Sequence, residues 1–393
     1  DWSSDVCSSD LMAPFSVACA MRRMCPACSG VSRNISTTRR LSFRHTSAAR
    51  VSSVVVAPVA ISAIERIEIL HGPGASLFGA DAFGGTINVI TRRETDSVSG
   101  TVEAGSFGLV AGGVNAGVTR GDIREALSAS VNRSAGFMFE RGFVNAAVSS
   151  RTSIGDRSGL FASFLSRDFG ANQFYGNAPS HEWTNQTLVS ADHRFVERAG
   201  WQLGADASYR THGDRFLFNV RTPGLFENVH RTHAARGGLK ASRSLGQDTR
   251  ITVGGEAGAD WIRSTNLGDH ATRRVSGFGE WRHALGTRTQ LDASLRVDRY
   301  TEFGTAWSPA AGISWWPSAS VRLRASAGRA FRVPTFTERY YQDPANFARP
   351  EVGPETAWAG DGGADLFLAD AHRIIVNGPT RLRGGREIGR AHV

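Results

Sequence analysis

The stretch RITVGGEAGADW, residues 250–261, alternates polar residues with small or apolar ones along its whole length. The apolar or small set comprises Ile251, Val253, Gly255, Ala257, Ala259 and Trp261, and the set between them comprises Arg250, Thr252, Gly254, Glu256, Gly258 and Asp260. A period of two predicts a β-strand with one apolar and one polar face. Strands of soluble sheets average about 5–6 residues, so a stretch this long fits a tilted strand that crosses a membrane.

The same alternation recurs along most of the chain. Trp201–Arg210 and Gln290–Asp298 repeat it, and roughly fourteen such segments lie between Thr101 and Leu368 when matched to the period-two template. The longest apolar run, near Val54–Ile61, is far shorter than the ~20 residues that a spanning helix needs. The sequence therefore predicts an all-β protein whose main part is a transmembrane antiparallel β-barrel.

The connectors between these segments alternate in length. Short turns are expected at Arg120–Asp122, Val196–Gly200, Gly246–Thr249, Gly286–Thr287 and Pro317–Ala319, and longer loops at Ser134–Arg141, Asp168–Trp183, His212–Val229, Ser264–Arg273 and Phe331–Glu355. Short periplasmic turns and long extracellular loops are typical of outer-membrane barrels. Trp201, Trp281 and the pair Trp315-Trp316 lie beside short turns, where a periplasmic aromatic girdle is expected. Phe303–Ala306 is an exception, because it is short where the alternation predicts a long loop.

The net charge of +9 comes mainly from the two ends of the chain. Residues 1–56 hold seven arginines against three aspartates, residues 377–393 hold four arginines against one glutamate, and the body between them is close to neutral. We therefore do not expect a nucleic-acid partner. Asp1–Leu11 and Arg386–Val393 resemble translated sequencing-adaptor sequence. We interpret residues 1–53 as artefactual or disordered and residues 377–393 as an artefactual tail, outside the fold.

All four cysteines lie in the N-terminal segment, at positions 7, 19, 25 and 28. Cys25 and Cys28 have the C-x-x-C spacing of a redox pair or half a zinc site, but no second ligand pair follows at a compatible spacing. We expect no metal site and no cofactor. No G-x-S-x-G, H-E-x-x-H or Walker motif occurs, and His230 and His233 would point to opposite faces of a strand. We expect no enzymatic activity.

A different pattern occupies Ala63–Arg93, AIERIEILHGPGASLFGADAFGGTINVITRR. Residues 64–70 predict one strand, the His71–Gly74 segment a turn, and residues 86–91 a second strand. This order resembles the end of the plug domain of TonB-dependent receptors, a small α/β domain. The residues that carry the resemblance are Glu65, Arg66, Glu68, Gly72, Pro73, Gly79, Gly84, Gly85 and Asn88. His71 and Phe78 depart from the family, which usually has Arg and Tyr there.

A second family-like segment, Ala327–Phe367, follows the predicted strands. Gly328–Glu338, GRAFRVPTFTE, and Pro350–Glu355, PEVGPE, resemble the barrel signature of vitamin B12 and siderophore receptors. The prolines at 334, 344, 350 and 354 cannot donate to a β-ladder, so they are expected in a loop. The resemblance places the C-terminal part of a plug at residues 54–96 and the N-terminal part of a barrel, about 14 strands, at residues 97–376.

The resemblance implies a receptor fragment in the outer membrane of a Gram-negative bacterium. The complete receptor would take up a scarce metal chelate, cobalamin or a ferric siderophore, with a TonB-type energising protein and outer-membrane lipid as partners. No candidate for the N-terminal box that such a protein grips occurs in residues 1–56. The alternative is a passive porin-like or adhesin-like barrel, which the plug-like segment disfavours. Loop aromatics are the expected ligand-binding residues: Phe174, Tyr175, Trp183, Tyr340 and Tyr341.

Overall fold

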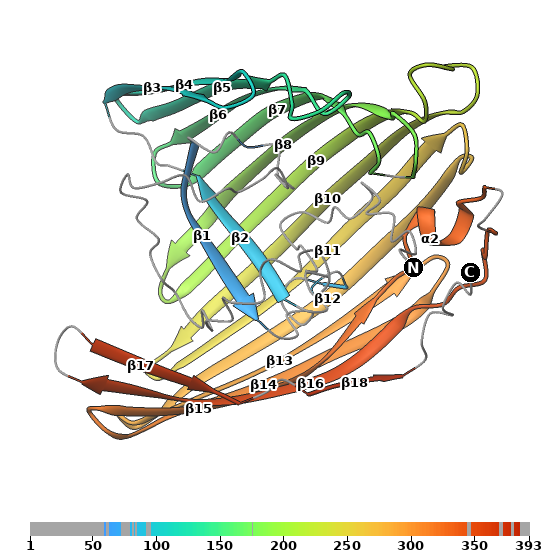
Figure 1. Cartoon of the computed structure of the whole chain (residues 1–393). Coiled ribbons are helices and arrows are strands. Elements are labelled where there is room, and N and C mark those ends of the chain that lie inside the picture. Colours follow the sequence, from blue (N-terminus) through green and yellow to red (C-terminus); the bar gives the residue numbers. More distant parts are fainter. Residues whose placement is uncertain are drawn as a thin grey trace.

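A computed structural model describes Val59 and residues 63–71, 79–80, 82, 85–91, 96–174, 176–343, 347–368, 372–378 and 381–385. Residues 1–53 lie outside the described residues. Two sheets are present, a hairpin of β1 (Ile64–His71) with β2 (Gly85–Thr91) and one sheet of sixteen strands. Figure 1 shows the large sheet curving around the hairpin.

The large sheet follows chain order. Each strand from β3 to β16 pairs antiparallel with the next, and β17 and β18 both pair with β16. The bounds are β3 (Ser97–Gly105), β4 (Leu109–Arg120), β5 (Ile123–Ser134), β6 (Phe143–Ile154), β7 (Ser158–Gly170), β8 (His181–Arg198), β9 (Trp201–Leu217), β10 (Glu227–Leu245), β11 (Thr249–Ser264), β12 (His270–Leu285), β13 (Thr289–Tyr300), β14 (Gly304–Ser318), β15 (Val321–Arg332), β16 (Glu355–Leu368), β17 (His372–Asn377) and β18 (Arg381–Gly385). The expected fold class, a partial antiparallel barrel preceded by plug-like structure, is confirmed.

The expected domain boundaries stay predictions. Residues 381–385, within the segment expected to be an artefactual tail, form β18 against β16. Residues 386–393 lie outside the described residues. A single short helix, α2 (Phe336–Tyr340), interrupts the connection from β15 to β16. No helix within the described part of the chain is long and apolar enough to cross a membrane.

The strands extend further than the alternation indicated. β7 ends at Gly170 and β8 begins at His181, so their connector is residues 171–180 and not Asp168–Trp183. The connector from β9 to β10 is likewise residues 218–226 and not His212–Val229. The predicted loops were too long because the alternation template required one apolar face on a strand, whereas these strand ends carry polar residues on both faces. Backbone pairing continues there regardless of the side chains.

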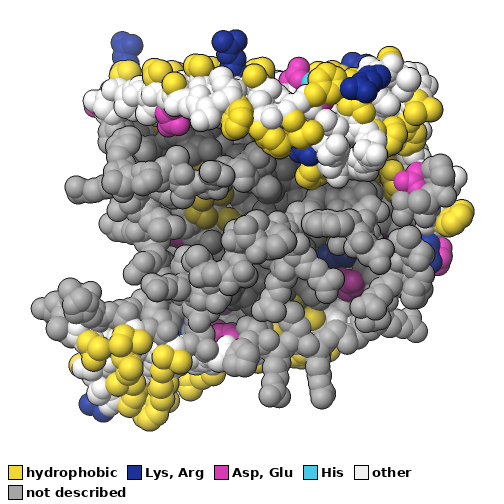
Figure 2. Space-filling model, in the orientation of Figure 1, with side chains coloured by type: hydrophobic (Ala, Val, Ile, Leu, Met, Phe, Trp, Pro, Cys, Tyr) yellow, Lys and Arg dark blue, Asp and Glu magenta, His cyan; other side chains and the backbone are white. Residues whose placement is uncertain are grey.

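The two faces of the sheet differ as the alternation requires. On β11, Val253 is exposed on the outer face, while its neighbour Thr252 is buried on the inner face. Figure 2 shows hydrophobic side chains gathered on the outer surface at the upper and lower margins of the molecule. Exposed outward residues of this kind include Val114, Val131, Val148, Phe164, Leu239, Val275, Leu295, Trp307 and Ile313. An apolar outer face and a polar inner wall are the arrangement of a membrane barrel.

The sheet has two free edges. In the described residues no pairing joins β3 to β17 or β18. Every residue of β3 is exposed, and Val98 and Val102 leave 76% and 87% of their surface accessible. An unpaired edge in lipid leaves backbone N–H and C=O groups without partners, at a cost of several kcal/mol each.

We predict that residues 57–376, expressed alone with a signal peptide, do not give a heat-modifiable, protease-resistant outer-membrane band. Its free edges, at β3 and at β16–β17, would aggregate or expose the chain to proteolysis, because the fragment ends before β18. Electrophoresis of heated and unheated outer-membrane fractions, with a closed receptor as the control, measures this. A stable band that restores ligand uptake in a receptor-deleted strain would overturn the prediction.

Candidate functional site

The β1–β2 hairpin carries a row of polar side chains. Glu68 pairs across the hairpin with Asn88, whose amide donates to the Glu68 carboxylate at 3.2 Å. Arg66 donates from Nε to Glu68 at 2.8 Å and from Nη1 to Glu65 at 3.2 Å. The hydrogen bond from Arg66 lowers the pKa of Glu68. Four residues of the predicted plug motif thus form one hydrogen-bonded row, while Gly72, Pro73 and Gly84 lie outside the described residues.

The residues just before the hairpin, together with the start of β1, pack against the inner face of the large sheet at β7 and β8. Val59 and Ala63 are buried with Phe161 of β7 and Leu188 of β8, and Ile64 of the hairpin packs against the same cluster. Phe161 and Leu188 therefore mark the inner face of their strands. The cluster fixes one side of the hairpin to the wall by burial of apolar surface.

A second contact lies across the hollow, at β12–β15. Ala80 is fully buried against Tyr300 and Phe331. Gly79 next to it has φ +87°, and a Cβ there would lie 3.3 Å from Nη1 of Arg274 and 3.6 Å from Nη2 of Arg296. The positive φ and the close approach both favour glycine. Gly79, selected from the sequence as a plug-motif residue, therefore lies directly on charged groups of the wall.

Those charged groups form a buried network on β11–β13. Nε of Arg296 donates to both carboxylate oxygens of Asp298 at 3.0 and 3.1 Å, and its Nη2 donates to Glu256 at 2.5 Å. Ser276 donates to Asp298 at 2.5 Å. Arg296 and Asp298 are fully buried. The alternation placed Glu256 on the polar face of its strand, but it did not identify Arg296 and Asp298 as a site, because it gives the face of a residue and not its partners.

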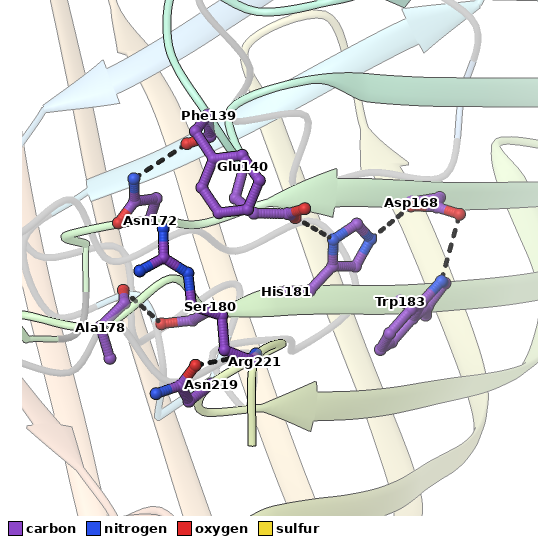
Figure 3. A network of polar contacts seen from close by, with 10 residues as sticks. All are labelled: Phe139, Glu140, Asp168, Asn172, Ala178, Ser180, His181, Trp183, Asn219 and Arg221. Atoms are coloured by element: carbon purple, nitrogen blue, oxygen red, sulfur yellow. Dashed lines mark hydrogen bonds and ion pairs between the residues drawn. The ribbon is translucent and has the colours of Figure 1, made fainter. Parts of the chain in front are cut away.

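The loops that follow β5, β7 and β9 are linked by hydrogen bonds to one another and to the adjoining strand ends. We call these three loops the loop layer. His181 accepts or donates at both ring nitrogens, 2.7 Å from Glu140 and 2.6 Å from Asp168, and Trp183 donates to Asp168 at 3.1 Å (Figure 3). The loop between β5 and β6 is thereby joined to β7 and β8.

The prediction that Trp183 lies in a loop is wrong, while its role in ligand binding stays a prediction. Trp183 belongs to β8 and pairs with Arg215 of β9, whose guanidinium lies 4.8 Å from the indole centroid. Leu188 faces inward with the plug cluster, so alternation turns Trp183 outward, to the side of exposed Val189. The error has the same cause as the overlong loops, since a polar strand end was taken for a loop.

Phe174 does lie in this loop layer. Its side chain is 55% exposed, and the guanidinium of Arg141 lies 6.0 Å from its ring and 5.9 Å from that of Phe137. Arg221, from the loop after β9, lies 5.2 Å from the ring of Phe139. Tyr175 lies outside the described residues. The layer therefore presents exposed phenylalanine rings beside two arginines.

Hydrogen bonds to backbone carbonyls hold the three loops of this layer together. Asn172 donates from its amide to the carbonyl of Phe139 at 2.9 Å, and Val220 N donates to the Pro179 carbonyl at 2.9 Å. Gly136 has φ +83°, and a Cβ there would lie only 2.3 Å from the carbonyl carbon of Arg141. These contacts make a pre-formed surface, which lowers the entropic cost of binding a ligand.

Tyr340 and Tyr341 belong to a second loop group, after β15. Tyr340 ends α2 and stacks on His270 of β12, with 3.5 Å between ring centroids and 6° between planes. Arg339 donates to Glu302 and lies 4.7 Å from the Tyr340 ring. Burial and a hydrogen bond with Asp343 raise the pKa of Tyr341 to about 12, so its phenol stays protonated. Pro334, Pro350 and Pro354 fall between β15 and β16, as expected, and Pro344 lies outside the described residues.

The base of this loop is a capped helix turn. Thr335 accepts from the Glu338 N–H at 3.1 Å, and Glu338 accepts from the Thr335 N–H at 2.8 Å, which is a capping box. Glu338 also accepts from both terminal nitrogens of Arg332, at 2.7 and 3.0 Å. Burial alone would raise the pKa of Glu338, but the contacts with Arg332 and Thr335 lower it on balance.

Across the part of the chain that the structure describes, no group of three His, Cys, Asp or Glu residues could hold a metal ion. The arrangement offers instead a polar wall, a seated hairpin and two loop groups that could enclose a large ligand. Residues 130–375 match the protein family described as TonB dependent receptor-like, beta-barrel.

The chain belongs to the TonB-dependent receptor family. The vitamin B12 transporter BtuB of Vibrio vulnificus is 28% identical over 328 residues, which cover 76% of this chain and 51% of that protein. The ferric enterobactin receptor PirA of Pseudomonas aeruginosa is 24% identical over 359 residues, 72% of this chain and 47% of the relative. The chain thus spans about half the length of these relatives.

Solved structures have the same fold. The siderophore receptor PirA from Pseudomonas aeruginosa superposes with a TM-score of 0.64 at 19% identity, covering 78% of this chain and 59% of that one. The siderophore receptor PiuA from Acinetobacter baumannii gives 0.63 at 12% identity, covering 80% and 61%. Family membership places the chain in the outer membrane of Gram-negative bacteria. The family consists of transport receptors.

We predict that the loop after β15 loosens in acid. Because contacts lower the pKa of Glu338 below its ordinary value of 4.5, their stabilisation is complete above that value and is lost as the pH falls through the lowered one. Glu338→Gln should loosen the loop at neutral pH by about 1 kcal/mol, because Gln can keep the capping hydrogen bond but loses the charge that binds Arg332. Limited proteolysis between pH 7 and pH 3 measures the effect. Equal cleavage of wild type and variant at neutral pH would contradict the assignment.

Proposed function

We propose that the complete receptor containing these residues carries out energised uptake of a scarce metal chelate. The proposal rests on one observation, that plug-like residues pack against the inner face of the curved sheet. They contact Phe161 and Leu188 on one side and Tyr300 and Phe331 on the other. A passive pore needs an open lumen. Residues held on both sides of the hollow favour a gated receptor over the porin-like or adhesin-like alternative.

The loop layer favours an anionic, ring-bearing chelate as the ligand. Exposed Phe174 and Phe137 provide flat apolar surface, and Arg141 and Arg221 provide positive charge beside it. Such a surface suits the aromatic rings and negative charge of a ferric catecholate siderophore. Cobalamin, the ligand named for BtuB, is the second candidate, because its large planar ring also suits stacking.

TonB-dependent receptors work with an energising TonB protein, and we propose the same partner for the complete receptor. Force applied to the plug would act on the two contacts described above. No chemical step is needed, because the ligand is bound, released and carried unchanged. The proposed activity is therefore transport without catalysis, and it requires no resident cofactor.

The test is ligand uptake by the complete receptor with Tyr340 and Tyr341 both replaced by Ala. We expect uptake of a ferric catecholate at sub-saturating concentration to fall about 30-fold, which is the effect of losing one binding hot spot. Tyr209→Ala is the matched control, since that tyrosine lies outward on β9 and is 39% exposed. Radiolabelled iron, as the ferric catecholate, and radiolabelled cobalamin, each given to receptor-deleted cells that express the complete receptor, distinguish the two ligands.

Protein amount and heat modifiability must match the wild type before uptake is compared, because Tyr340 also packs on His270. Unchanged affinity and uptake in the tyrosine variant would exclude these residues from the ligand site. Failure of both ligands to accumulate in cells with wild-type receptor would contradict the proposed ligand classes.

A further inference from the structure

Four arginines lie on the outer face of neighbouring strands, near the ends that lead into the long loops. They are Arg231 of β10, Arg263 of β11, Arg273 of β12 and Arg299 of β13, and all are exposed. Their chain neighbours mark the inward direction, because Ile262, Arg274, Asp298 and Tyr300 are buried. We call these four residues the outer arginine row.

No acidic side chain among the described residues neutralises the charges of the outer arginine row by an ion pair. Arg231 and Arg263 pair directly across β10 and β11. Like charges at directly opposed positions destabilise a sheet. None of the four makes an ion pair with another described residue, and the one side-chain contact shown is Arg299 with the Thr305 hydroxyl at 3.0 Å. By contrast, Arg215 on the same face is paired with Glu227 at 2.6 Å.

Further along the strands, away from the loops, the residues of the outer face follow the order expected at a membrane interface. Next along the strands lie Tyr209, His233 and Trp261, with the Tyr209 hydroxyl 2.7 Å from Nδ1 of His233. The His233 and Trp261 rings stack with 5.0 Å between centroids. Apolar residues follow, including Leu239 and Val253, both more than half exposed. Aromatic residues at this depth mark the headgroup level of a bilayer, so the arginines lie among or just above the headgroups.

We propose that the outer arginine row binds the phosphate groups of an anionic lipid of the outer leaflet, with Arg231 and Arg263 as its centre. Guanidinium groups bind phosphate through paired N–H donors, and an anion between two opposed arginines removes their repulsion. A lipid is favoured over free phosphate because apolar wall continues directly below the charges. One lipid could then hold its phosphate on the row and its acyl chains on the outer face of β10–β12.

The experiment uses the complete receptor, purified in a neutral detergent, with native mass spectrometry and thermal unfolding as readouts. The probes are diphosphorylated lipid A, the same lipid with its phosphates removed, and inorganic phosphate. We expect only the phosphorylated lipid to be retained and to raise the Tm. Arg231→Gln with Arg263→Gln should weaken its binding on the order of 30-fold, from the contribution of two basic residues near a lipid surface.

Arg243→Gln is the matched control, because Arg243 is also exposed on the outer face of β10 but lies at the opposite end, against Trp201. It should leave lipid binding unchanged. Equal binding by the double variant, equal loss in Arg243→Gln, or equal binding of dephosphorylated lipid would each overturn the proposal. Inorganic phosphate that competes fully at equal concentration would show an anion site without lipid recognition, and would overturn it too. Ligand uptake by the double variant reports folding independently.

Discussion

Pairing of the backbone N–H and C=O groups is the constraint on which the rest of the structure depends. In a bilayer these groups find no water, so a spanning chain must pair them internally, and an extended chain can do so only with its neighbours in a sheet. The antiparallel order from β3 to β16 satisfies this strand by strand. Side-chain alternation then assigns lipid to one face and the lumen to the other, as Val253 and Thr252 illustrate on β11.

The inner wall brings a second constraint, because a buried charge must be paired. Arg296 and Asp298 are fully buried and are held with Glu256 and Ser276 in one network. Breaking a buried pair on one side is strongly destabilising. Gly79 rests on this network through close backbone approach. The plug-like residues therefore contact the inner face of the sheet at a defined place, through a glycine that lies on charged side chains, and not through a large apolar interface.

Much of the fold could be predicted from the sequence, because period-two alternation reports the face of each residue directly. The run of long strands followed from it, whereas the loop prolines followed from their missing N–H donor and the plug motif from the resemblance to a known family. The ends of strands could not be predicted, since polar residues occupy both faces above the bilayer, and Trp183 was assigned to a loop for this reason. Contacts such as that of Tyr340 in α2 with His270 of β12 join residues seventy positions apart, and no local pattern encodes them.

A spin-label scan of β11 tests most directly whether one face of the sheet meets lipid and the other meets the polar lumen. All four cysteines of this sequence lie at positions 7–28, so residues 251–260 can each be replaced by a single cysteine in the complete receptor, once any cysteines native to that receptor are replaced by serine. Power-saturation EPR compares accessibility to oxygen, which is enriched in lipid, with accessibility to a water-soluble nickel chelate. The account predicts high oxygen accessibility at Ile251, Val253 and Ala257 and low values at Thr252 and Glu256. Absence of a period of two, or the opposite phase, would contradict it.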